Sequence, residues 1–318
     1  MDILNKMWFS QAVVLLAAWA CLADVAHSEG KIKQSMSALR SETRSKRMVG
    51  GTLAPPVPWQ AMVYLADSVY DGGFAGGALI SDRWVLTSGR NVFVMKNHQD
   101  TRGKDPTIPK VYLGITERAE ANASNEFAVQ KVVLHPAFQN QTNWENDLAL
   151  IQLKDPVVVG EKVTPIPLPE RGQDLGDTVE GRGAIAGWGF GTFLTYANSL
   201  KHLVLPLANH SSCKELYNIT AHMPAVDDNK FCTGPSKYDE NVCSGDAGGA
   251  LAVKDPESGA VYAAGILSYD RSCRRDKYAV YMKISTYLPW IHSVMRGDTE
   301  RSPAVRAVIM DAMLARQP

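Results

Sequence analysis

The chain has 318 residues, of which 45% are hydrophobic and 21% are charged. This is the composition of an ordinary globular protein, long enough to form one large core or two moderate ones. Lysine plus arginine and aspartate plus glutamate each number 33, so the formal net charge is zero. The balance argues against a strongly basic nucleic-acid-binding protein and against an acidic, solvating tail.

Residues 1–28 have the pattern of a secretory signal peptide. A short polar start precedes an apolar run from about Val13 to Ala23, which is too short to cross a bilayer comfortably. Small residues would permit cleavage after Ala20, Ala23 or Ser28. The alternative is an uncleaved anchor. The pattern predicts a secreted protein, and no later segment is apolar enough to span a membrane.

The segment that follows, residues 29–47, is polar and basic and has no strand pattern, which is typical of a disordered pro-segment. It ends in RSKR, residues 44–47, a basic cluster that convertase-type proteases cleave. A basic linker is the alternative. We expect a folded domain at 48–297 and a loosely attached tail at 298–318. The tail is rich in Ala and Met, and a partner-binding helix there is the alternative, although short isolated helices are marginal.

The expected domain consists of short apolar runs bounded by Gly, Pro, Asn and Asp, which is typical of β-strands. Few segments carry helical periodicity, and residues 285–295 are one of them. Many short strands without alternating helices predict an all-β sandwich or pair of barrels. The expected strands lie at 60–66, 76–80, 83–88, 111–115, 127–134, 148–153, 183–189, 201–208, 261–269 and 278–284.

The cysteines indicate disulfide bonds rather than a metal site. Cys21 lies in the signal region, and the other four are Cys213, Cys232, Cys243 and Cys273. An even number in an oxidising compartment predicts two disulfides, but spacing alone does not choose among the three pairings. There is no CxxC and no cluster of histidines, so we expect no metal and no cofactor.

Asn-X-Ser/Thr sequons support secretion and predict exposed, glycosylated loops. A single sequon is weak evidence, but several in a chain with a signal peptide make glycosylation of the surface a reasonable expectation. The four acceptor residues are Asn122, Asn140, Asn209 and Asn218.

Four motifs now point to a family. They are MVGG at 48–51, WVLTSGRN at 84–91, NDLALIQL at 146–153 and CSGDAGGA at 243–250. In this order they resemble the activated N-terminus, the base motif, the carboxylate motif and the nucleophile loop of chymotrypsin-family serine proteases. The resemblance covers residues 48–297. It implies a trypsin-like pair of six-stranded β-barrels with the site between them and a C-terminal helix.

The resemblance assigns Arg90, Asp147 and Ala247 to the three catalytic positions. Acyl transfer needs a hydroxyl nucleophile, a base that accepts its proton and a carboxylate that orients the base. A methyl group cannot attack a carbonyl, and a guanidinium has no acceptor lone pair. Histidines occur elsewhere, but none lies in the base motif. We therefore predict a pseudoprotease, not an enzyme; an active serine protease would need a nucleophile that Ala247 cannot supply.

Other family positions also differ. Ala75 and Asn91 stand where active relatives have the two cysteines of a disulfide. Asn241 takes the place of the specificity-pocket Asp of trypsin-like enzymes, and Asp270 and Ala279 replace glycines that keep that pocket open. The added side chains predict a narrowed pocket. Neutral change in exposed loops is the alternative.

The activation machinery, by contrast, has its residues in place. Asp246 matches the carboxylate that pairs with the new amino terminus, which here would be Met48 after cleavage at Arg47. We expect this cleavage to order the surrounding loops without switching on catalysis. The family pattern also implies the disulfide pairs Cys213–Cys232 and Cys243–Cys273.

Residues 131–138, 231–253 and 262–273 closely resemble the haptoglobin family, which has Ala at the nucleophile position and no His at the base position. The resemblance implies a plasma protein that captures haemoglobin αβ dimers and so limits the loss of haem iron and oxidative damage. The alternative for the proposed contacts is ordinary solvated loops. The candidate haemoglobin contacts are Lys237, Tyr238, Tyr269 and Tyr278.

The N-terminal part differs from that of mammalian haptoglobins. Residues 29–47 contain no cysteine and are too few for a complement-control module, and Pro167 stands where the linking cysteine would be. We therefore expect no covalent light-chain link, as in a lower-vertebrate haptoglobin with a short light chain. The rival interpretation is another pseudoprotease, one that regulates a clotting, complement or antimicrobial pathway. For this chain we expect no nucleic-acid partner and no membrane partner.

Overall fold

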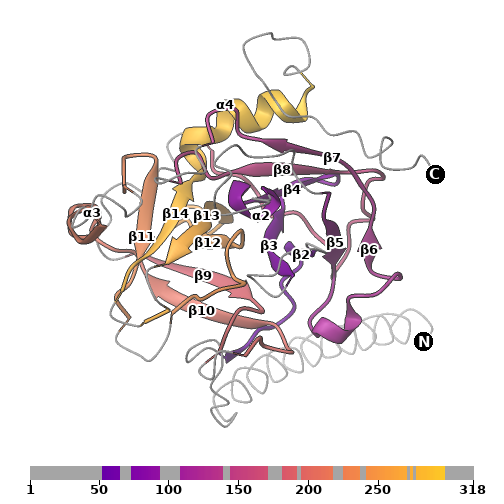
Figure 1. Cartoon of the computed structure of the whole chain (residues 1–318), viewed down its shortest axis with the longest axis horizontal. Coiled ribbons are helices and arrows are strands. Elements are labelled where there is room, and N and C mark those ends of the chain that lie inside the picture. The colour runs from indigo at the N-terminus through magenta and orange to yellow at the C-terminus, as the bar shows by residue number, and fades with distance from the viewer. Residues whose placement is uncertain are drawn as a thin grey trace, which may run out of the picture. The chain divides into compact units, whose positions relative to one another are not determined.

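A computed structural model of the chain places two seven-stranded antiparallel sheets side by side, with short helices at their edges (Figure 1). The structure describes residues 52–64, 73–93, 108–138, 144–170, 181–191, 195–217, 225–236, 241–270, 273–274 and 277–297.

The first sheet has the order β6-β5-β2-β3-β4-β8-β7. Its strands are β2 (Gln60–Tyr64), β3 (Phe74–Leu79), β4 (Trp84–Thr87), β5 (Lys110–Leu113), β6 (Glu126–Phe127), β7 (Val129–Leu134) and β8 (Ala149–Leu153). Its interior is filled by Val, Leu, Ile and Ala side chains that alternate along the strands, among them Val63, Val85, Val111 and Ile151.

The second sheet has the order β1-β10-β9-β12-β13-β14-β11. Its strands are β1 (Thr52–Leu53), β9 (Arg182–Gly187), β10 (Lys201–Pro206), β11 (Lys230–Thr233), β12 (Ala250–Lys254), β13 (Val261–Asp270) and β14 (Ala279–Lys283). Residues such as Ile185, Leu203, Leu251 and Tyr281 form its own apolar core.

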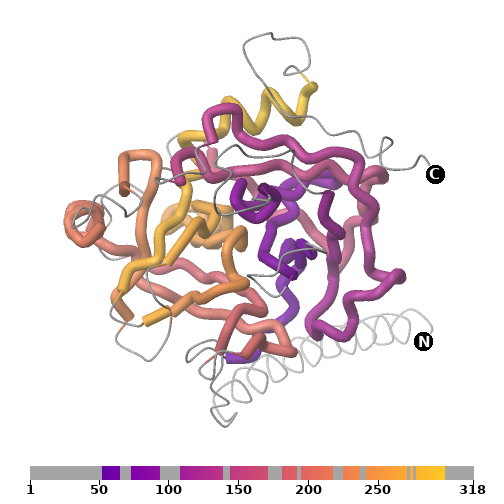
Figure 2. Tube along the Cα trace, viewed as in Figure 1, coloured from indigo at the N-terminus to yellow at the C-terminus, as the bar shows by residue number. Residues whose placement is uncertain are grey.

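A third apolar cluster joins the two sheets. Leu86 and Leu150 of the first sheet share it with Ala252 and Ile266 of the second. The helix α4 (Ile284–Met295) contributes Ile284, Tyr287, Ile291 and Val294 to the same cluster. Figure 2 follows the chain from the first sheet into the second and shows α4 returning across β7 and β8 of the first. The two sheets therefore form one packed unit, which holds the loops between them in place.

The trypsin-like all-β fold is confirmed, and so is the helix expected at 285–295. Each of the ten expected runs overlaps a strand. The sheets have seven strands rather than six because each ends in a two-residue strand, β1 or β6. The patterns missed the strands β1, β11 and β12 and the helix α3 (His210–Tyr217). The small alanines of β12 carry little strand propensity. Among the described helices, none has the length and apolarity needed to cross a membrane.

Candidate functional site

Three loops bring the triad positions together where the two sheets meet. Arg90 lies on the short helix α2 (Gly89–Val92) directly after β4, and Asp147 precedes β8. Ala247 precedes β12 of the second sheet. Figure 1 shows α2 between the strands of the two sheets. The fold therefore keeps the family's arrangement although two of the side chains differ.

Asp147 is fully buried, and its carboxylate is satisfied by two groups. Oδ1 accepts a hydrogen bond of 2.7 Å from the backbone N–H of Arg90, and Oδ2 accepts one from the Ser268 hydroxyl. Burial raises the pKa of Asp147, while the charge of Arg90 and these hydrogen bonds oppose the rise. The carboxylate is thus held by a backbone amide and a hydroxyl. The motifs identified Asp147, but nothing in them marked Ser268 as its partner.

The Arg90 side chain stacks instead of accepting a proton. Its guanidinium carbon lies 5.2 Å from the centre of the Trp144 ring, a cation–π contact. Its Nε is buried and has no hydrogen-bond partner in the described part of the chain. A guanidinium is always protonated, so this group cannot act as a general base.

The loop at the nucleophile position is anchored through its backbone. The carbonyl of Ala247 accepts hydrogen bonds from the Gly76 N–H at 2.9 Å and from the Asn91 amide at 2.8 Å. Asn91 is 8% exposed, so this bond is shielded from water. The sequence marked Asn91 only as one end of a missing disulfide. In the structure it links α2 of the first sheet to the loop before β12.

The side chains at the specificity-pocket positions are engaged by the protein itself. The Asn241 amide donates to the Arg274 carbonyl at 2.6 Å and to the Lys277 carbonyl at 3.3 Å. Asp270 accepts a hydrogen bond from the backbone N–H of Cys273. Ala279 is fully buried and lies opposite Asp270 in the pairing of β13 with β14. These contacts hold the Asn241 and Asp270 side chains within the domain, and the narrowed pocket stays a prediction.

Asp246 is a fully buried carboxylate, and its hydrogen-bond donors among the described residues are neutral backbone N–H groups. It accepts hydrogen bonds from the Gly189 N–H at 2.8 Å and the Cys243 N–H at 2.9 Å. Burial raises its pKa to about 7, although the two N–H groups pull it down. Within the described residues no cation pairs with it. Its expected partner, Met48, and the cleavage residue Arg47 lie outside the described residues.

Comparisons with known proteins agree with this geometry. The family model described as Trypsin matches residues 48–291. The haptoglobin of Oryctolagus cuniculus is 35% identical over 270 residues, covering 80% of this chain and 71% of that protein. The chain belongs to the trypsin family and, within it, to the haptoglobins. The haptoglobins of Mesocricetus auratus and Sus scrofa are 35% and 34% identical, over 79% and 80% of this chain and 70% and 71% of their own lengths.

The disulfides follow the pairing that the resemblance implied. Cys213 is bonded to Cys232, and Cys243 to Cys273. The first bond ties α3 to β11, and the second ties the loop before β12 to the segment after β13. Among the described residues no three His, Cys, Asp or Glu side chains gather into a metal site.

One candidate haemoglobin contact is corrected by the structure. Tyr269 is not a loop residue but lies in β13 and is only 5% exposed, with its ring packed edge-on against Tyr217. The register of β13 with β14 shifts between Leu267 and Tyr269. Tyr278 is half-buried, and its carbonyl accepts a hydrogen bond from Tyr217. Lys237 and Tyr238 lie outside the described residues.

Two of the four sequons can be placed. Asn122 and Asn209 are both exposed, as expected of glycosylation sites. The Asn209 oxygen also accepts a hydrogen bond from the Ser212 N–H at the start of α3. A glycan on the Asn209 nitrogen would leave this oxygen free to accept, so the two roles are compatible. Asn140 and Asn218 lie outside the described residues.

Proposed function

We propose that this haptoglobin-family chain is a non-catalytic plasma protein that captures free haemoglobin. One observation carries the proposal. The chain resembles haptoglobin over four fifths of its length, and in the same chain the base position of the triad holds Arg90, which stacks on Trp144. A fold without its reaction must act by binding. No cofactor is needed for this role.

The chemistry supports the absence of protease activity. Ala247 offers no nucleophilic atom, and Arg90 offers no lone pair to take a proton. Asp147 accepts hydrogen bonds from the Arg90 backbone amide and the Ser268 hydroxyl, and the side chain at the base position is a guanidinium, so there is no imidazole for the carboxylate to orient. A serine-directed fluorophosphonate should therefore leave the purified protein unlabelled, while trypsin treated alongside is labelled. Labelling at a serine of this chain would contradict the proposal.

The region around Asn241 has the types of side chain that binding a haemoglobin αβ dimer would require. A dimer exposes the interface that it forms in the tetramer, and capture requires covering a large, partly apolar surface with a few aromatic and cationic anchors. Tyr278 and the exposed Arg274 lie beside the Asn241 loop and are of these types. Lys237, Tyr238 and Tyr278 remain the proposed contacts, Arg274 is added to them, and Tyr269 is withdrawn.

We further propose secretion and cleavage after Arg47, which separates segment 29–47 from the domain at 48–297. The freed amino group of Met48 would supply the cation that buried Asp246 lacks. No covalent light-chain link is proposed, since Pro167, at the linking position, is exposed and has no thiol. The tail at 298–318 is not assigned a role in binding.

The decisive test is binding of the secreted, purified protein to haemoglobin, with myoglobin as the control for haem proteins in general. Tight binding of haemoglobin alone is the expected result. Tyr278→Ala should weaken it, whereas the matched Tyr64→Ala, on β2 of the first sheet and 38% exposed, should not. A folded, cleaved protein that ignores haemoglobin would favour the second candidate, a pseudoprotease that regulates a clotting, complement or antimicrobial pathway.

A further inference from the structure

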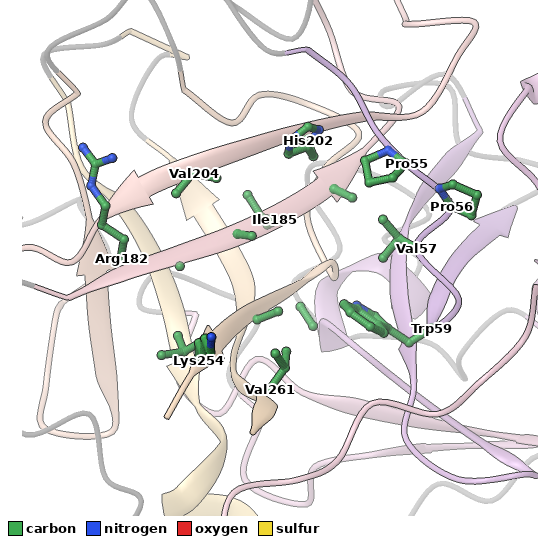
Figure 3. Close-up of a pocket in the computed structure, with 16 residues that line it drawn as sticks. Pro55, Pro56, Val57, Trp59, Arg182, Ile185, His202, Val204, Lys254 and Val261 are labelled. Carbon is green, nitrogen blue, oxygen red and sulfur yellow. The ribbon is translucent and has the colours of Figure 1, made fainter. Parts of the chain in front are cut away.

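A hollow on the outer face of the second sheet, away from the triad positions, is not explained by the proposed function. It has a volume of about 340 Å³ and lies between the segment that precedes β2 and the strands β9, β10 and β12 (Figure 3). This volume falls at the lower end of the range for small-molecule sites, ~300–1,000 Å³.

Side-chain size explains why the sheet is hollow here. Ala184 of β9 lies between Ala252 of β12 and Val204 of β10 in the register of the sheet. Two neighbouring methyl groups leave a depression, because side chains at paired positions project from the same face. Trp59 forms one wall, and the prolines before it continue that wall. The polypeptide thus builds a concave apolar surface with a rigid rim.

The hollow is not covered by any described residue. Val204 and Val261, which line it, are 44% and 41% exposed. Apolar side chains left in water are unfavourable by roughly 25 cal/mol for each Å² that a ligand would cover. An apolar ligand would therefore gain binding free energy by covering them.

The charged side chains that line the hollow are both cations, and both lie at one end of it. Arg182 and Lys254 lie at the end away from Trp59 (Figure 3), and both are exposed. Neither forms an ion pair with a described residue. No Asp or Glu is among the residues that line the hollow. An apolar wall at one end and two cations at the other match a molecule with an apolar tail and an anionic head.

We infer that this hollow binds one small amphipathic carboxylate, with its hydrocarbon tail against Trp59 and Ala184 and its carboxylate towards Arg182 and Lys254. The chain's own segment 29–47 is a poorer occupant, because it is basic and would meet two cations. The inference is independent of haemoglobin capture, since none of the proposed haemoglobin contacts is among the residues that line the hollow.

The test is isothermal titration of the full, purified protein with hexanoate, octanoate and decanoate. Each added pair of methylenes should tighten binding about fifteenfold until the hollow is full. Ala184→Leu should abolish saturable binding by filling the hollow, whereas Ala184→Ser, which keeps the volume, should retain it. Both variants should keep the melting temperature of the parent, so that a loss of binding is not a loss of fold.

A second experiment tests whether the two cations bind the carboxylate of the ligand. Arg182→Gln with Lys254→Gln should weaken octanoate by roughly tenfold, two- to fivefold for each exposed charge, and leave 1-octanol unchanged. Absence of saturable binding at millimolar decanoate would overturn the inference. Equal binding of decanoate by the Ala184→Leu variant would overturn it as well, since the ligand would then lie elsewhere. Haemoglobin binding, measured in parallel, is expected to be unaffected in all variants.

Discussion

Cleavage after Arg47 should change how the stability of the domain depends on pH, and buried Asp246 is the reason. We compare an uncleavable Arg47→Ala variant with the parent protein after cleavage at Arg47. In the uncleaved chain the pKa of Asp246 rises from 3.8 to about 7. Ionising this carboxylate is therefore about 4 kcal/mol less favourable in the folded chain than in the unfolded one, an order-of-magnitude figure.

The sign follows from proton linkage. Between pH 3.8 and about 7 the folded uncleaved chain holds a proton that the unfolded chain has lost, so its stability falls as the pH rises through this window. At pH 7.5 the full penalty of about 4 kcal/mol applies, and at pH 5 less than half of it does. In the cleaved protein the Met48 ammonium should pair with the carboxylate and offset most of the penalty.

Urea unfolding of both forms at pH 5 and pH 7.5 measures the effect. The cleaved form should be the more stable by a few kcal/mol at pH 7.5, and the gap should narrow at pH 5. Asp246→Asn removes the titrating group and should abolish the difference in pH dependence. Parallel loss of stability in the two forms between these pH values would refute the pairing of Asp246 with the new amino terminus.

Three further predictions concern packing and protonation. Gly189→Ala should destabilise the protein by about 3 kcal/mol, because a methyl there overlaps the Asp246 carboxylate, whereas Gly160→Ala, with nothing within 4 Å, should stay within about 0.5 kcal/mol in chemical denaturation. Asn91→Ala should lower the free energy of unfolding by about 2 kcal/mol, because the buried hydrogen bond to the Ala247 carbonyl is lost. An unchanged urea midpoint would show that this hydrogen bond does not stabilise the domain. His135 has a pKa lowered to about 4 by burial. Its ring should therefore show no NMR titration between pH 8 and 5, and stability should fall as the pH drops from 6.5 towards 4; titration near 6.5 would contradict its burial.

The sequence by itself determined the family, the fold class and the absence of the reacting atoms. Motif order and residue type carry this information locally: Ala247 lacks a hydroxyl in any conformation, and Arg90 lacks a lone pair. The disulfide pairing also came from the sequence, but through the family resemblance rather than the spacing of the cysteines. The helix at the end of the domain was visible because its apolar period is 3.6.

Only the tertiary structure decided which side chains are exposed and able to bind a partner, and which are buried or bonded within the domain. Tyr269 is buried in a cluster with Tyr217, a residue distant in the sequence, and no local pattern encodes that contact. Asn91 bonds a carbonyl 156 residues away. The hollow arises because Ala184 and Ala252, 68 positions apart by their numbers, become neighbours in the register of one sheet. Such features depend on strand register and on contacts between distant segments, and these exist only once the chain has folded.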